Sequence, residues 1–222
     1  MTPRNFNQLI SEIKLNLPTE IDHSTMDGKT SVVAKVITLR AGFLHRVFDL
    51  ATSAHRNSSE NNVVSGNILT RAILETVAVT AYLSNIIKKY IKTNDIEVLN
   101  TKLMRLMVGS QGNEACKPIN IMECIHLVDK EIDGFMTYYD TLSAFSHPNF
   151  NGTCGFYGEL NGNKPTLFSS IPKDIEKHKS DSIDLICLVL ETFTHYIMVI
   201  AENMEQFIEQ YNVGKLKYEG SD

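Results

Sequence analysis

Residues 67–83, NILTRAILETVAVTAYL, constrain the fold of this chain more than any other segment. A helix built from them is apolar on nearly every side, and such a helix normally lies at the centre of a bundle. Arg71 and Glu75 interrupt the segment four positions apart, so their side chains lie one turn apart on one face. A charge held among apolar neighbours is costly unless it is paired. The segment therefore predicts a core helix whose charged pair either joins helices or belongs to a site.

Helical apolar periodicity recurs along most of the 222 residues. The helices that it predicts cover residues 6–17, 31–54, 61–91, 95–108, 120–129, 135–146 and 175–211. Residues 18–30 form a polar connector in which Asp27 and Gly28 favour a turn. We expect one helical domain spanning residues 1–222, with residues 212–222 as a flexible tail.

Residues 153–170 are the place where the period changes from helical to two. Apolar and other residues alternate from Cys154 to Leu160, and Asn161-Gly162 is a strong hairpin turn signal. A second short extended run follows at residues 166–169. We therefore predict a mainly α fold, a multi-helix bundle with a small β-hairpin inserted before the long C-terminal helix.

Composition and charge narrow the class of protein. A hydrophobic content of 43% supports a large core, and a net charge of −5 argues against a protein that mainly coats nucleic acid. The four cysteines include no C-x-x-C pair, so buried thiols are their simplest role. No signal peptide pattern opens the chain, and we expect a cytoplasmic protein.

The last predicted helix is apolar enough between residues 183 and 200 to suggest a membrane span. Asp184, Glu191 and His195 interrupt that stretch. A charge at the centre of a bilayer costs roughly 2.5 to 3.5 kcal/mol on insertion scales. A core helix that does not enter a membrane is therefore the expectation.

The segment YYDTLSAFSHPN carries candidate site residues. Tyr138, Leu142 and Phe145 are predicted to form a packing stripe. The polar residues of the neighbouring stripe are Tyr139, Ser143 and His147. Exposed carbonyls at a helix end favour an imidazolium, so His147 is a candidate for proton transfer. The alternative is a histidine that only caps its helix before Pro148.

The order of the charges in the Arg71 and Glu75 pair is informative. Arginine before glutamate at this spacing is the less favourable order for an exposed pair. A buried clasp between helices, a binding site and a solvated pair all stay open.

Two further pairs have spacings that suggest chemistry. Glu191 and His195 could bind a metal if Glu75 and His147 converge on them, although neither copy of the Glu-x-x-His signature of di-iron bundles is present. A core histidine is the simpler interpretation of His195.

Arg40 and His45 have the R-x4-H spacing of HEPN ribonucleases, in which arginine and histidine from two subunits cut RNA. The polar residue usual after the arginine is Ala41 here. An ordinary helix role is the alternative for this pair.

Arg71-x-x-x-Glu75, followed some seventy residues later by Tyr139-x-x-x-Ser143-x-x-x-His147-Pro148, resembles a family of uncharacterised bacterial helical proteins with R-x-x-x-E and L-S-x-x-x-H-P motifs. The resemblance covers about residues 30–210. It implies a helical domain allied to HEPN-like proteins of bacterial phage defence and toxin systems. It also implies that Arg71, Glu75, Ser143 and His147 meet in space.

These patterns lead to two functional hypotheses. In the first, Arg71 binds an anion such as phosphate, Glu75 orients Arg71, and His147 acts as acid or base beside Ser143 and Tyr139. The most concrete form is a ribonuclease without metal or cofactor, acting on RNA or a nucleotide as a homodimer. The alternative is a non-catalytic helical interaction module in which the same residues are structural and apolar surfaces form the dimer.

Overall fold

The computed structural model describes residues 5–24, 31–110, 112, 116–150, 152–159, 167–172 and 174–219. The fold is 77% helical, with a small antiparallel hairpin before the long C-terminal helix, so the predicted fold class is confirmed. The predicted turns at Asp27-Gly28 and Asn161-Gly162 lie outside the described residues.

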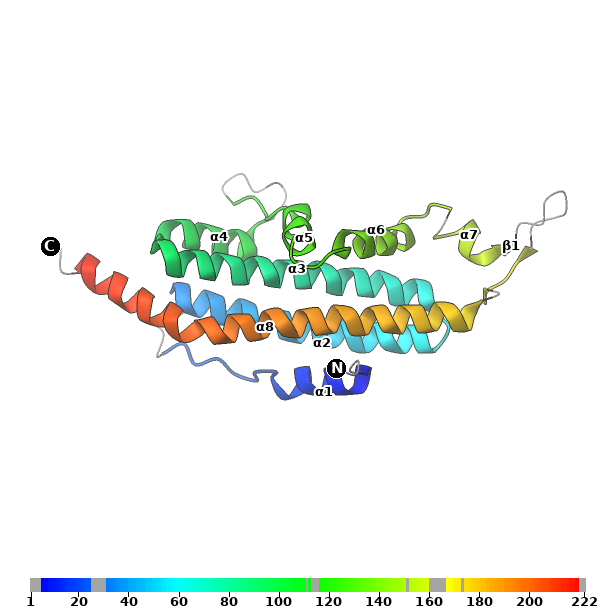
Figure 1. The fold of residues 1–222 in the computed structure, drawn as a ribbon, viewed down its shortest axis with the longest axis horizontal. Coiled ribbons are helices and arrows are strands. Elements are labelled where there is room, and N and C mark those ends of the chain that lie inside the picture. Colours follow the sequence, from blue (N-terminus) through cyan, green and yellow to red (C-terminus); the bar gives the residue numbers. More distant parts are fainter. Residues whose placement is uncertain are drawn as a thin grey trace.

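Three long helices run side by side and form the body of the bundle (Figure 1). They are α2 (Val32–Ser59), α3 (Val63–Thr93) and α8 (Ile175–Glu219). The short helix α1 (Phe6–Leu15) packs across α2 and α8. Helices α4 (Ile96–Val108), α5 (Ile121–Asp129) and α6 (Phe135–Ser146) lie along α3. Helix α3 thus contacts helices on several sides, as its apolar circumference predicted.

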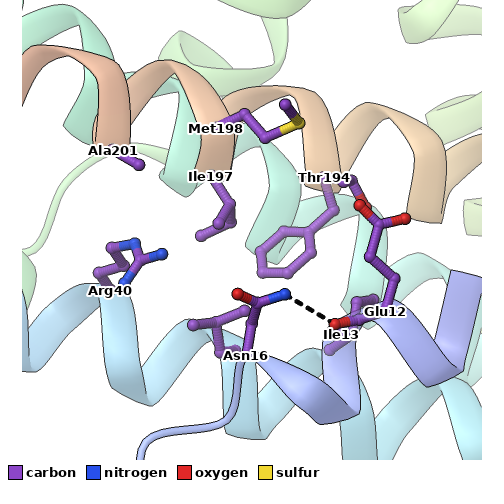
Figure 2. Close-up of a pocket in the computed structure, with 10 residues that line it drawn as sticks. Glu12, Ile13, Asn16, Arg40, Thr194, Ile197, Met198 and Ala201 are labelled. Atoms are coloured by element: carbon purple, nitrogen blue, oxygen red, sulfur yellow. Dashed lines mark hydrogen bonds between the residues drawn. The ribbon is translucent and has the colours of Figure 1, made fainter.

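The core consists of two adjoining clusters of buried side chains. The first joins α3 to α8 through residues such as Leu74 and Phe193, both fully buried. The second lies toward the C-terminal half of α3, where Leu83 and Ile87 meet Phe207. Burying one such side chain contributes about 1.5 to 3 kcal/mol, so these clusters fix where α3 and α8 lie. Between α1, α2 and α8 the packing leaves a cavity (Figure 2).

Two helices are long and apolar enough to cross a membrane by length and composition, namely α3 and residues 175–214 of α8. In this bundle 56% of the most apolar window of α3 and 50% of that of α8 are buried inside the structure. Helices in the core of a bundle can be as long and as apolar as membrane-spanning helices, so length and composition alone do not assign α3 or α8 to a membrane.

Helix α2 is longer than predicted, because it continues through polar residues beyond its predicted end at residue 54. His55 stacks on Phe6 with ring centroids 3.9 Å apart, and Ser58 is completely buried. The Ser58 and Ser182 hydroxyls are 2.8 Å apart, and Ser182 donates to Asn67 Oδ1 at 2.8 Å. Partners supplied by α1, α3 and α8 therefore hold this end of α2 in helical form.

The β-hairpin is smaller than the alternating pattern suggested. Residues Cys154–Tyr157 form a short helix, α7, and the strands β1 (Gly158–Glu159) and β2 (Leu167–Phe168) have two residues each. Phe156 explains the difference, because its ring packs against Phe145 and His178 rather than along a strand. Helix α7 and the hairpin extend beyond the end of the bundle (Figure 1).

Two boundaries also differ from the sequence expectations. Helix α8 continues to Glu219, so residues 212–219 are helical where a flexible tail was predicted. The cap of α4 is Asp95, which accepts the Val98 N–H at 3.0 Å. Asn94, the residue before it, ends α3 with a positive φ of 54°.

Candidate functional site

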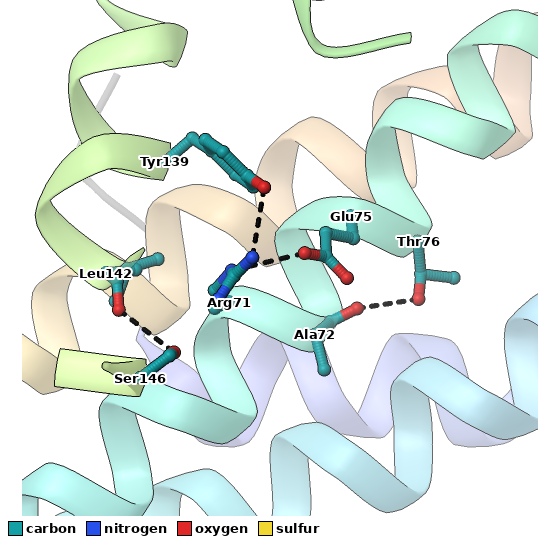
Figure 3. Close-up of polar contacts among 7 residues, drawn as sticks. All are labelled: Arg71, Ala72, Glu75, Thr76, Tyr139, Leu142 and Ser146. Atoms are coloured by element: carbon teal, nitrogen blue, oxygen red, sulfur yellow. Dashed lines mark hydrogen bonds and ion pairs between the residues drawn. The ribbon is translucent and has the colours of Figure 1, made fainter. Parts of the chain in front are cut away.

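Arg71 links α3 to α6 through its guanidinium (Figure 3). Its Nη2 donates a hydrogen bond to the Tyr139 hydroxyl at 3.0 Å, and its Cζ lies 5.1 Å from the centre of the Tyr139 ring. Its Nε lies 3.2 Å from Glu75 Oε1. The Nε–H does not point at that oxygen, so the contact is an ion pair without hydrogen-bond geometry. We call these three residues the Arg71 cluster.

The Arg71 cluster is only partly shielded from solvent. The Arg71 side chain is 23% exposed and the Glu75 side chain 33% exposed. The pair is therefore half-buried, between the extremes of a fully buried clasp and a freely solvated surface pair. A guanidinium has five N–H donors, and the contacts with Tyr139 and Glu75 use only part of them. Arg71 is thus held in place with donors left over.

Tyr139 lies on the packing face of α6, which corrects the predicted stripes. The residue is 8% exposed, whereas Tyr138, assigned to the packing stripe, is 37% exposed. Phe135, Tyr139 and Leu142 form the buried face. The Tyr139 ring therefore packs in the core while its hydroxyl meets Arg71, which suits the amphipathic character of tyrosine.

Ser143 is placed one turn after Tyr139 and carries a buried hydroxyl without a hydrogen-bond partner. Other hydroxyls of α6 bond to the carbonyl one turn earlier, as Ser146 Oγ does with Leu142 O at 3.2 Å (Figure 3). Buried polar atoms are rarely left unpaired in folded proteins, and each exception calls for a physical reason. Ser143 is such an exception.

His147 is exposed and ends α6 as its C-cap, where its backbone N–H donates to the Ser143 carbonyl at 3.2 Å. Its ring has no hydrogen bond or ion pair with the part of the chain that is described. It follows Tyr139 by eight residues, which is about 12 Å along a helix axis. The structure therefore joins Arg71, Glu75 and Tyr139 and leaves His147 two turns away.

A surface hollow of about 260 Å3 adjoins the Arg71 cluster and is lined by Glu75, Thr76, Arg46 and Phe43 among others. The Arg46 Nε donates to Thr76 Oγ1 at 3.1 Å, and Thr76 in turn donates to the Ala72 carbonyl at 2.8 Å. The hollow thus places a second arginine near Glu75. Sequence reasoning missed Arg46, because nothing in the spacing of α2 distinguishes it from a surface residue.

Within one chain, the residues of the Arg40 and His45 pair have different surroundings. The His45 Nε2 lies 2.8 Å from the Pro18 carbonyl, whereas Arg40 lines the cavity under α1. His195 is exposed beside the Tyr196 ring, so the expectation of a core histidine is wrong. No three His, Cys, Asp or Glu side chains gather as a metal site among the described residues.

The cysteines only partly follow the prediction of buried thiols. Cys124 is buried, whereas Cys154 is exposed and the other two are half-buried. Burial, together with Glu123, raises the pKa of the Cys124 thiol to about 12. A thiol of this kind is a core residue and a poor nucleophile.

Comparison of the chain with protein-family models, curated proteins and solved structures finds no match.

Proposed function

We propose that the chain binds a phosphate group of RNA or of a nucleotide at the Arg71 cluster, and that it is a HEPN-like ribonuclease of a bacterial defence or toxin system. The observation that carries the proposal is a partly exposed guanidinium fixed by Glu75 and Tyr139, with the unpaired hydroxyl of Ser143 one turn after Tyr139 on α6. Guanidinium groups recognise phosphate oxygens through paired N–H donors. Arg46 adds positive charge at the adjoining hollow.

His147 completes the proposed chemistry as the group that moves protons. About 12 Å separates the levels of Tyr139 and His147 along α6, a span that an RNA strand covers and a single phosphate does not. His147 removes the proton from a 2′-hydroxyl, whose oxygen attacks the adjacent phosphorus. The P–O5′ bond breaks, giving a 2′,3′-cyclic phosphate and a 5′-hydroxyl that takes up a proton. No metal or cofactor takes part in this reaction.

A second function is favoured by the same contacts. The hydrogen bond and ring contact between Arg71 and Tyr139 tie α3 to α6, which is what a structural clasp does. The chain would then be a non-catalytic helical interaction module that dimerises.

A comparison of Arg71→Met, His147→Ala and the control Arg56→Met separates the two functions. Arg56 is exposed on α2, so its loss changes net charge equally without touching the site. For the ribonuclease, Arg71→Met should weaken binding of labelled single-stranded RNA at least about tenfold. His147→Ala should abolish cleavage while leaving binding and the melting temperature unchanged.

The interaction module predicts a different pattern. No variant would then differ in RNA binding or cleavage, and Arg71→Met alone would lower the melting temperature, because the α3–α6 clasp is lost. Cleavage by the His147→Ala variant at the rate of the unaltered chain would contradict the ribonuclease.

A further inference from the structure

A cavity of about 130 Å3 lies between α1, α2 and α8, whereas the Arg71 cluster lies between α3 and α6. Its walls are mainly apolar and come from Ile13, Leu44, Phe193 and Ile197. An engineered apolar cavity of about 150 Å3 holds a benzene molecule. This space is therefore large enough for an apolar group of nearly that size.

Arg40 lines one end of the cavity (Figure 2). Its guanidinium has no hydrogen-bond or ion-pair partner among the described residues, and its Nε is buried. Burial lowers the pKa of Arg40. The residue as a whole is half-buried, so its charge is partly removed from water, and an anionic partner would offset that cost.

The other polar side chains that line the cavity either form hydrogen bonds within the protein or lie opposite Arg40. Asn16 Nδ2 donates to the Glu12 carbonyl at 2.8 Å, and Thr194 Oγ1 donates to the Leu190 carbonyl at 2.9 Å. The Glu12 carboxylate lies across the cavity from Arg40 and forms no ion pair with it (Figure 2). Arg40 is therefore the polar group that a ligand would satisfy.

We propose that this cavity binds a small organic monocarboxylate whose apolar body is no larger than a benzene ring. The carboxylate accepts hydrogen bonds from the Arg40 guanidinium, which matches its geometry in a bidentate pair. The apolar body lies against Phe193, Ile197 and Leu44.

Titration of the full chain with benzoate, benzamide and acetate, followed by NMR chemical shifts, tests both halves of the proposal. Benzoate should bind at least about tenfold more tightly than benzamide, which lacks the charge, because a hydrogen bond to a charged group is worth about 1.5 to 3 kcal/mol. Benzoate should also bind more tightly than acetate, which lacks the apolar body. Equal affinity of benzoate with either probe would overturn the proposal.

Variants place the binding in this cavity. Arg40→Met keeps the length of the side chain and should weaken benzoate binding at least about tenfold. Arg56→Met on the same helix, outside the cavity, should leave the affinity unchanged. Ala201 is exposed at the cavity, so Ala201→Phe should fold normally while filling the space and blocking benzoate.

Arg40→Met and Ala201→Phe test the cavity in different ways, so the proposal can still be tested if one of the two variants does not fold. If Arg40→Met does not fold, Ala201→Phe alone decides the matter. Benzoate binding that survives Ala201→Phe, or that Arg40→Met and Arg56→Met weaken equally, would overturn the proposal. Loss of binding in Arg40→Met with retention in Arg56→Met supports it.

Discussion

At the scale of single residues, Ser143 differs from other hydroxyl residues of α6 because its side chain makes no hydrogen bond to the helix backbone. Its hydroxyl is buried and unpaired, whereas that of Ser146, three positions later, bonds to the Leu142 carbonyl. A buried polar group without a partner is destabilising by about 1 to 3 kcal/mol. An RNA or nucleotide ligand bound at the Arg71 cluster, as proposed above, would give this hydroxyl a hydrogen-bond partner.

Ser143→Ala should stabilise the chain while weakening RNA binding. Alanine also raises helix propensity by a few tenths of a kcal/mol, so Ser146→Ala serves as the matched control that carries the same propensity gain. We expect the free energy of unfolding to rise by about 1 kcal/mol more for Ser143→Ala than for Ser146→Ala in urea titrations. Equal gains from both substitutions would show that the Ser143 hydroxyl is satisfied in solution.

At the scale of elements, Tyr196 connects α8 to the segment between α5 and α6. Its ring is buried, and its hydroxyl donates to Glu131 Oε2 at 2.7 Å. Hydrogen bonds to charged groups contribute about 1.5 to 3 kcal/mol, and the exposure of Glu131 reduces that value. This one contact therefore helps to fix α5 and α6, which carry the surroundings of the Arg71 cluster.

Tyr196→Phe should lower the free energy of unfolding by about 1 kcal/mol, because the ring still fills the core but the hydrogen bond is lost. Thermal unfolding followed by circular dichroism measures the effect. Tyr138→Phe removes a hydroxyl from an exposed tyrosine of α6 and should change almost nothing. A loss as large in Tyr138→Phe would mean that the Glu131 contact contributes nothing specific.

The helices were predictable where burial follows the apolar period. Helices α3, α4, α5 and α6 lie within two residues of their predicted limits. The prediction failed where contacts between distant residues determine the local structure. At the polar end of α2, Ser58 forms a hydrogen bond with Ser182, which lies 124 positions later in the chain. It failed for α7 as well, since Phe156 contacts Phe145 and His178.

The candidate site was predictable in the same partial way. The functional hypothesis grouped Arg71 with Tyr139, which lie 68 positions apart and form a hydrogen bond, but it also grouped them with His147, which lies two turns further along α6. The sequence did not indicate the hollow beside Arg46 or the cavity beside Arg40. Both are formed by side chains from several helices, and the spacing of residues within one helix does not predict how the helices pack together.

At the scale of the whole molecule, the buried acids of the core determine how stability depends on pH. Burial raises the pKa of the Cys124 thiol to about 12, and burial also raises the pKa of Tyr82, Tyr90 and Tyr196. Tyr196 is raised further by its hydrogen bond to Glu131. These groups keep their protons in the folded chain at pH values where the unfolded chain has released them.

Stability should therefore be present below the ordinary thiol and tyrosine pKa values, and it should fall as the pH rises through 9 and 10 toward the folded values. One pH unit above its unfolded pKa, Cys124 alone accounts for a loss of about 1.4 kcal/mol. Urea titrations between pH 7 and pH 11 should show this decline, and Cys124→Ala should make it shallower while Cys154→Ala, at an exposed position, leaves it unchanged. The same slope in both variants would contradict this prediction, because it would mean that the buried Cys124 thiol ionises as readily in the folded chain as in the unfolded chain.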